Sequence, residues 1–146
     1  MRGRVVFCLL IFLVVFSCLG YYFSFFGVSS GGEDSVVWLH GISFRVPAGY
    51  MMVESCNGTD DLGITTEDYI FANDEGYIID LSILYNGNVE NFRVDDSVHW
   101  PCSLGGRDGM ASSGRNFFNF IFRVGDCQVS VLARNESVVE KFIGVV

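Results

Sequence analysis

Residues 117–133 read FFNFIFRVGDCQVSVLA, and this stretch decides the fold because it predicts a β-hairpin with a defined register. A two-residue turn at Gly125-Asp126 sets apolar residues opposite each other. The pairs are Val124 with Cys127, Phe122 with Val129, Phe120 with Val131 and Phe118 with Ala133. A slip of one residue would move the phenylalanines into water, so turn and pattern agree on one pairing.

Two further hairpins are predicted nearer the N-terminus. Val36–Val46 alternates around a tight turn at His40-Gly41, and Pro47 ends its second strand because proline cannot donate to a ladder. Tyr69–Ala72 and Tyr77–Tyr85 flank a turn and form the next hairpin, with one apolar and one polar face.

Three segments have no clear strand pattern. Cys56–Glu67 is polar and contains glycine, which predicts a loop. Val89–Val94 fits either a strand or a short helix. Asp95–Gly114 contains several glycines, which predicts a long loop or an irregular edge of the kind that often carries function.

The chain closes with a short helix that Asn135 or Ser137 can cap. Its apolar residues would face a sheet, namely Val138, Val139, Phe142 and Ile143. The predicted fold is therefore α+β: an N-terminal transmembrane helix, then a small antiparallel β-sheet domain built of hairpins with the C-terminal helix packed on it.

The transmembrane helix is predicted from the apolar run Val5–Val28, which follows Arg2 and Arg4. A helix of this length could cross a hydrocarbon layer about 30 Å thick. Because the arginines precede the run, the N-terminus is expected in the cytoplasm and the main domain outside, in the periplasm or at the cell exterior. The domains are an anchor at 1–28, a flexible tether at 29–35 and an extracytoplasmic α+β domain at 36–146.

Two alternatives for the N-terminal segment stay open. Cleavage after Ser17 or Gly20 would give a secreted protein, and cleavage before Cys18 would give a lipoprotein. The uncleaved anchor is favoured because the aromatic residues that follow would form a belt at the outer membrane interface. These residues are Tyr21, Tyr22, Phe23, Phe25 and Phe26.

Three cysteines lie in the part expected outside the cytoplasm, where disulfides can form. We expect a bridge between Cys102 and Cys127, because it would join the glycine-rich segment to the late hairpin. A bridge between Cys56 and Cys127 is the alternative. Either would contribute on the order of 3 kcal/mol by restricting the unfolded chain.

Acidic residues concentrate between Glu54 and Asp96, and the whole chain has a formal net charge of −8 at pH 7. This charge disfavours nucleic acid, since phosphates would be repelled, and favours a basic protein partner. We expect the contact in this acidic region or in Asp95–Gly114. The candidate residues are Asp60, Asp61, Glu67, Asp68, His99 and Trp100.

The residues that could support catalysis are few. His99 and Cys102 are three positions apart, a spacing that a metal pair or a thiol–imidazole pair can use. Two ligands do not close a zinc site, and a disulfide would compete for Cys102. We therefore predict no catalytic residue, metal or cofactor, and a hydrolase that uses His99 is the least favoured function.

Three pieces of the chain carry a family resemblance: Gly41–Tyr50, the late hairpin and the terminal helix in Ser137–Val146. Together they resemble the PsbP-like family, which includes an extrinsic photosystem subunit and small bacterial proteins. The resemblance implies an antiparallel sheet with helices packed against it, and an exported binding or assembly module. No functional residue is implied by it.

These observations predict a membrane-anchored extracytoplasmic binding domain without catalysis that engages a basic protein through an acidic surface. An immunity-type protein that intercepts a basic toxin is one form of this function. A structural or assembly subunit of an envelope complex is the alternative.

Overall fold

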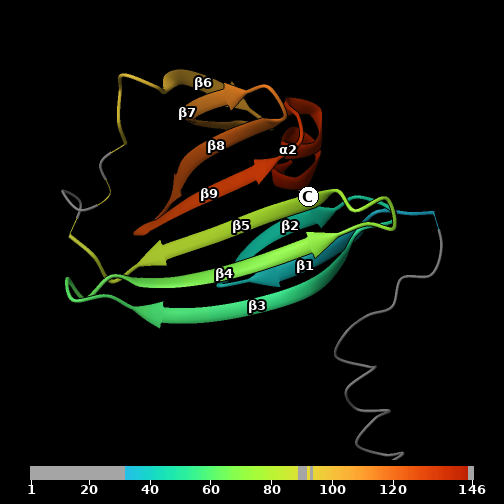
Figure 1. Ribbon diagram of the computed structural model, residues 1–146. Helices are drawn as coiled ribbons and strands as arrows, with labels where there is room; N and C mark the ends of the chain where they lie inside the picture. The colour runs from blue at the N-terminus through green and yellow to red at the C-terminus, as the bar shows by residue number, and fades with distance from the viewer. Residues whose placement is uncertain (1–31, 89–91, 93, 145–146) are drawn as a thin grey trace, which may run out of the picture. The chain divides into compact units, whose positions relative to one another are not determined.

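The late hairpin has the predicted register in the computed structural model, which describes residues 32–88, 92 and 94–144 (Figure 1). β8 (Phe117–Val124) pairs antiparallel with β9 (Cys127–Ala133), and Phe120 lies opposite Val131. Both of these side chains are fully buried. The prediction is confirmed at all four apolar pairs.

β8 and β9 belong to a seven-stranded antiparallel sheet with the order β3-β4-β5-β9-β8-β7-β6. The other strands are β3 (Met51–Thr59), β4 (Thr65–Ala72), β5 (Ile78–Tyr85), β6 (Trp100–Leu104) and β7 (Arg107–Gly114). A separate hairpin is formed by β1 (Ser35–Leu39) and β2 (Ile42–Val46). The predicted hairpins Val36–Val46 and Tyr69–Tyr85 are thus confirmed.

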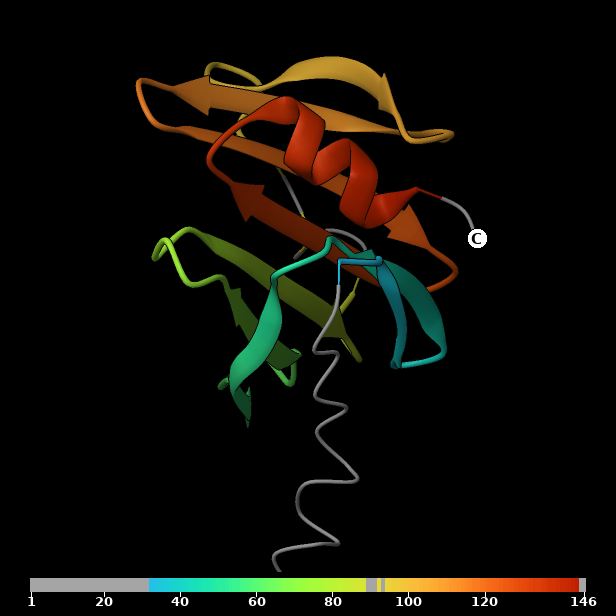
Figure 2. The same ribbon diagram turned by 90° about the vertical axis from the view of Figure 1, so that its right-hand side faces the viewer.

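The core lies on one face of the large sheet, which we call the inner face. It is covered by the β1–β2 hairpin and by helix α2 (Glu136–Ile143), which Figures 1 and 2 show lying across β8 and β9. Asn135 caps α2, since its side-chain oxygen accepts a hydrogen bond of 3.1 Å from the backbone N–H of Val138. Phe142 of α2 stacks on Phe44 of β2 at 5.2 Å between ring centroids.

The described part of the chain agrees with the predicted β-sheet domain and its C-terminal helix. The apolar run Val5–Val28, the possible cleavage site at Cys18 and residues 29–31 of the tether lie outside the described residues. Within the described residues, no helix is long and apolar enough to cross a membrane.

The loop predicted at Cys56–Glu67 is wrong, because β3 extends to Thr59 and β4 begins at Thr65. β3 is an edge strand, and most of its side chains are exposed. A strand in this position needs no alternation of apolar residues, so its polar composition resembled that of a loop.

The long loop or irregular edge predicted at Asp95–Gly114 is at the edge of the sheet, but it is not irregular for most of its length, because β6 and β7 form a regular hairpin. Gly105 and Gly106 make its turn with φ angles of 57° and 78°, which glycine adopts readily. Gly109 lies within β7, where an added Cβ would overlap the backbone oxygen of Ile121. The glycines of this segment therefore serve a turn and a close packing contact.

Val89–Val94 lies largely outside the described residues. Phe92 is described and buried, with its ring near Gly87 and under the guanidinium of Arg123 at 5.5 Å.

The expected disulfides are contradicted by the strand order. Cys56, Cys102 and Cys127 are free thiols. Cys102 on β6 and Cys127 on β9 are separated by β7 and β8, so roughly 14 Å of sheet lies between them. Cys56 on β3 is separated from β9 by β4 and β5. A disulfide needs Cα atoms about 5.5 Å apart, so neither pair can be bridged.

The close packing at Gly109 predicts a specific cost of substitution. Gly109→Ala should lower the free energy of unfolding by about 1–3 kcal/mol, because the new methyl group would overlap the Ile121 oxygen and the Phe120 ring. Urea denaturation measures this. Gly58→Ala in β3 is the control, since a Cβ there meets nothing within 4 Å. Equal losses in the two variants would contradict the packing described.

Candidate functional site

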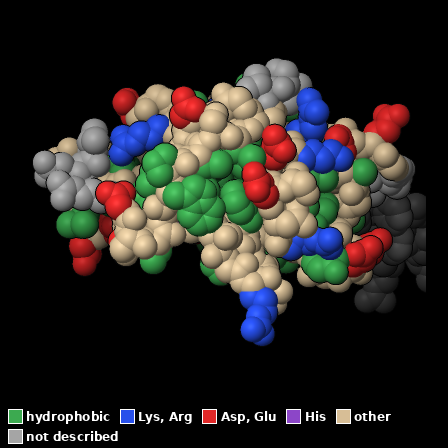
Figure 3. All heavy atoms as spheres, turned by 90° about the horizontal axis from the view of Figure 1, so that it is seen from above, with side chains coloured by type: hydrophobic (Ala, Val, Ile, Leu, Met, Phe, Trp, Pro, Cys, Tyr) green, Lys and Arg blue, Asp and Glu red, His purple; other side chains and the backbone are tan. Residues whose placement is uncertain are grey.

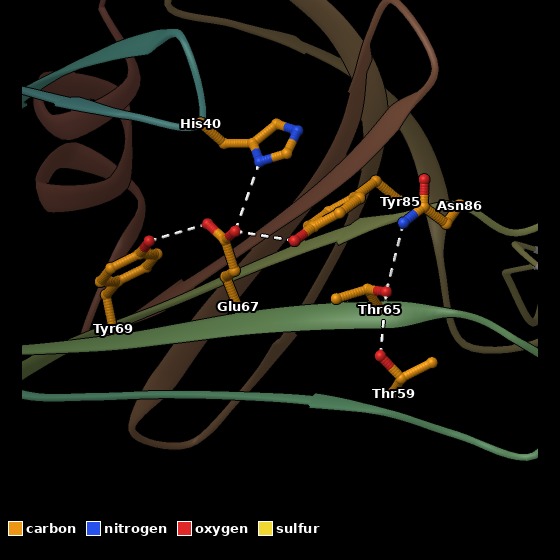
Figure 4. Close-up of polar contacts among 7 residues, drawn as sticks. All are labelled: His40, Thr59, Thr65, Glu67, Tyr69, Tyr85 and Asn86. Atoms are coloured by element: carbon orange, nitrogen blue, oxygen red, sulfur yellow. Dashed lines mark hydrogen bonds and ion pairs between the residues drawn. The ribbon is translucent and has the colours of Figure 1, made fainter.

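A polar cluster forms around Glu67 on the inner face of the sheet (Figure 4). The hydroxyl of Tyr69 donates to Oε2 of Glu67 at 2.8 Å, and that of Tyr85 donates to Oε1 at 2.8 Å. Nδ1 of His40 lies 3.4 Å from Oε1. One carboxylate thus joins residues from three separate segments.

The cluster is positioned by strand alternation and by a strained turn. Glu67 and Tyr69 are two residues apart on β4 and share its inner face, and Tyr85 ends the neighbouring strand β5. His40 lies in the β1–β2 turn with φ of 49°, and its ring packs on Tyr85 at 4.1 Å between centroids. The cluster therefore fastens the tip of the β1–β2 hairpin to the sheet.

The electrostatics of the cluster favour a charged carboxylate and neutral phenols. Burial alone would raise the pKa of Glu67, but hydrogen bonds from Tyr69 and Tyr85 and the contact with His40 outweigh it and lower this pKa. Burial, with the hydrogen bond to Glu67, raises the pKa of Tyr69 to about 12. The hydrogen bond to Glu67, with burial, also raises the pKa of Tyr85.

This arrangement suits a structural role, which is to hold the hairpin tip on the sheet, better than acid–base chemistry. We call the cluster the latch, and its residues are His40, Glu67, Tyr69 and Tyr85. A carboxylate whose pKa is lowered is a weak base at neutral pH, and phenols whose pKa is raised do not release protons readily. Both hydroxyl groups are already committed to Glu67.

The acidic candidate residues do not form one surface. Glu67 and Asp68 are adjacent on β4 and point to opposite faces, where Asp68 accepts a hydrogen bond of 2.6 Å from the Ser82 hydroxyl. Asp60 is used within the β3–β4 turn, since its side chain accepts from the backbone N–H of Leu62 and Ile64 at 2.9 Å. Asp61 is exposed in the same turn.

Asp80 adds a second carboxylate to the face that Asp68 occupies. Its strand position, two residues before Ser82, places it beside Asp68 across the β4–β5 ladder. Burial, followed by repulsion from Asp68, raises the pKa of Asp80.

His99 and Cys102 are not brought together as a reactive pair. Nδ1 of His99 lies 2.9 Å from the backbone oxygen of Asp95, and no hydrogen bond between described residues joins it to Cys102. Burial raises the pKa of the Cys102 thiol, which disfavours a thiolate nucleophile. Across the described ranges, no group of three or more His, Cys, Asp or Glu side chains could hold a metal ion.

Trp100 lies at a free edge of the sheet, because no described strand pairs with the other side of β6. Trp100 is 43% exposed and meets Phe118 edge-on at 6.5 Å. On the other face of the same strands, Pro101, Met110 and Ile121 are in register and partly or fully exposed, and Phe117 is 42% exposed. We call Trp100, Pro101 and Met110, which lie on β6 and on its neighbour β7, the β6 edge.

Figure 3 views the domain from the side on which β6 and β7 lie. Hydrophobic side chains gather near the centre of this face, and acidic and basic side chains surround them.

Comparisons of the chain with models of protein families, with curated proteins and with solved structures give no match. The resemblance to the PsbP-like family therefore stays a prediction.

Sequence reasoning missed His40, Tyr69 and Tyr85 as partners of Glu67. The available signal was Glu67 itself, since it occupies an inner-face position two residues from Tyr69. That signal depends on β4 beginning at Thr65, and the predicted loop at Cys56–Glu67 concealed it.

The latch predicts a pH-dependent contribution to stability. Because folding lowers the pKa of Glu67, its contribution is present above the pKa of the unfolded chain and is lost as pH falls through the folded value. Wild type should exceed Glu67→Gln by about 1 kcal/mol in free energy of unfolding at pH 7, after allowance for solvent screening. This difference should shrink between about pH 5 and pH 3.

Denaturant unfolding across that pH range measures the difference. Glu75→Gln is the control, because Glu75 is exposed in the β4–β5 turn and its side chain makes no hydrogen bond to a described residue. A difference for Glu67→Gln that stays constant with pH would contradict the latch.

Proposed function

We propose that this protein is a non-catalytic, membrane-anchored binding module whose extracytoplasmic domain engages a protein partner through the β6 edge. The observation that carries the proposal is that Trp100 on the edge strand β6 is 43% exposed. Its ring contacts the ring of Phe118 on β8. The membrane anchor of the proposal is the apolar run Val5–Val28.

Exposed aromatic residues on an apolar area are typical of protein contact surfaces. Tryptophan is enriched among the residues that contribute most to binding free energy, and such residues are surrounded by a polar rim. Trp100 has such a setting, since it is exposed and follows the exposed acidic residues Asp95 and Asp96 along the chain.

The chemistry of β6 favours docking through side chains over the addition of a strand. Pro101 has no backbone N–H to donate, and proline on an edge strand opposes pairing with another chain. A partner would therefore contact the ring of Trp100 rather than extend the sheet.

The charge of the chain supports a basic partner. Asp95 and Asp96 are exposed and precede Trp100 by a few residues, and the chain as a whole carries a formal charge of −8. A partner with an apolar centre and basic rim would complement this end of the domain, and an immunity-type interaction with a basic toxin is one form of it. The acidic residues of β3 and β4 do not share one face of the sheet, so they support the proposal less.

The proposal predicts that the two tryptophans differ in their effect on partner binding. Trp100→Ala should weaken binding by about 2 kcal/mol, or roughly 30-fold, because a central aromatic anchor is lost. Partners are first captured from a detergent extract of the native membranes with the wild-type chain. The affinity of each purified partner for the variants is then measured by calorimetry.

Trp38→Ala is the matched control, since Trp38 is 71% exposed and lies on β1. It should bind the partner as wild type does. Wild-type affinity in Trp100→Ala, or an equal loss in both variants, would contradict a contact at the β6 edge.

A further inference from the structure

We propose that the outer face of the β1–β2 hairpin, formed by Val36, Trp38 and Arg45, rests on the surface of the lipid bilayer that holds the N-terminal run. This inference rests on the membrane anchor of the proposed function and is independent of partner binding at the β6 edge.

The hairpin has two apolar faces, and the core uses one of them. Val37 and Leu39 pack against the core, whereas Trp38 is 71% exposed and Val36 is 43% exposed on the opposite side of β1. Arg45 of β2 lies opposite Val36 and shares this outer face. Most of the surface of Trp38 is left uncovered by the described residues, so its large apolar ring has little role in their packing.

The start of the hairpin is fixed to the domain by Asp34. Its Oδ1 accepts a hydrogen bond of 3.1 Å from the backbone N–H of Ala48 and lies 2.8 Å from Nζ of Lys141. The hydrogen bond from Lys141 lowers the pKa of Asp34 and keeps this carboxylate charged. The chain therefore enters the domain at a defined point beside β1.

The distance from that point to the end of the apolar run is short. Residues 29–34 separate Val28 from β1, and the seven steps from Val28 to Ser35 span at most about 25 Å. An anchored run would keep the hairpin within that distance of the bilayer surface.

The side chains of the outer face suit the interfacial region of a bilayer. The indole ring of Trp38 is apolar and carries one N–H donor, and tryptophan is enriched at membrane interfaces for this reason. The guanidinium of Arg45 can reach phosphate groups while its aliphatic stem lies along apolar surface.

A lipid surface fits this face better than a second copy of the chain. A stable protein interface buries about 800 Å² on each partner. Trp38 supplies only about 150–250 Å² of such surface, and Val36 adds little more. This area is small for a dimer but is sufficient to orient a domain that is already tethered.

Tryptophan fluorescence of the full chain in phosphatidylcholine vesicles tests the proposal. The chain contains two tryptophans, so Trp100→Phe leaves Trp38 as the single emitter. The emission of Trp38 in vesicles should lie at shorter wavelength than that of the unfolded chain in water. It should lose most of its intensity when the lipid chains are brominated near the glycerol end. Trp38→Phe is the matched control and leaves Trp100, whose emission should not be quenched.

Three results would overturn the inference. Trp38 that stays unquenched in a chain that floats with the vesicles would show that the hairpin is not on the lipid. An emission shift that grows with protein concentration, without loss of intensity in brominated lipid, would indicate contact between copies. A chain that does not float would remove the anchor, and the calorimetry of Trp100→Ala would still decide partner binding separately. Trp100→Tyr replaces Trp100→Phe if that variant does not fold.

Discussion

The structure depends on the aromatic contact that closes the inner face of the sheet. Phe142 of α2 stacks on Phe44 of β2, and its ring meets that of Phe71 of β4 at 5.3 Å. All three rings are buried, and together they join the helix, the small hairpin and the large sheet. An antiparallel sheet with one apolar face must bury it, and here two separate elements share that task.

The position of both exposed tryptophans follows from this packing. Because Phe44 holds β2 on the inner face, the β1–β2 turn brings His40 to Glu67, and the alternation of β1 turns Trp38 away from the core. Trp100 belongs to the last strand of the sheet, and Figures 1 and 2 place β6 beyond β8 and β9 from this hairpin. The domain thus offers two separated surfaces, which the proposals assign to lipid and to a protein partner.

The sequence predicts the strands that bury one face and fails where burial is slight. Phe120 and Phe122 alternate beside a Gly125-Asp126 turn, so their hairpin was predictable with its register. β3 is exposed and polar, and β7 contains a glycine that packing requires, so neither has the expected pattern. Strand order and the partners of Glu67 depend on contacts between distant segments, which explains the wrong disulfide and the missed latch. Trp100 was a candidate because Asp95–Gly114 was interpreted as a functional loop, whereas the structure places this residue on an edge strand.

Nuclear Overhauser effects between aromatic ring protons test the central claim most directly, with the phenylalanine rings assigned by selective labelling. The account predicts cross-peaks from Phe142 to both Phe44 and Phe71, since the ring centroids lie 5.2 Å and 5.3 Å apart. Absence of both cross-peaks in a folded chain would mean that α2 and the β1–β2 hairpin do not close the inner face together. The described positions of His40, Trp38 and the tether would then be wrong as well.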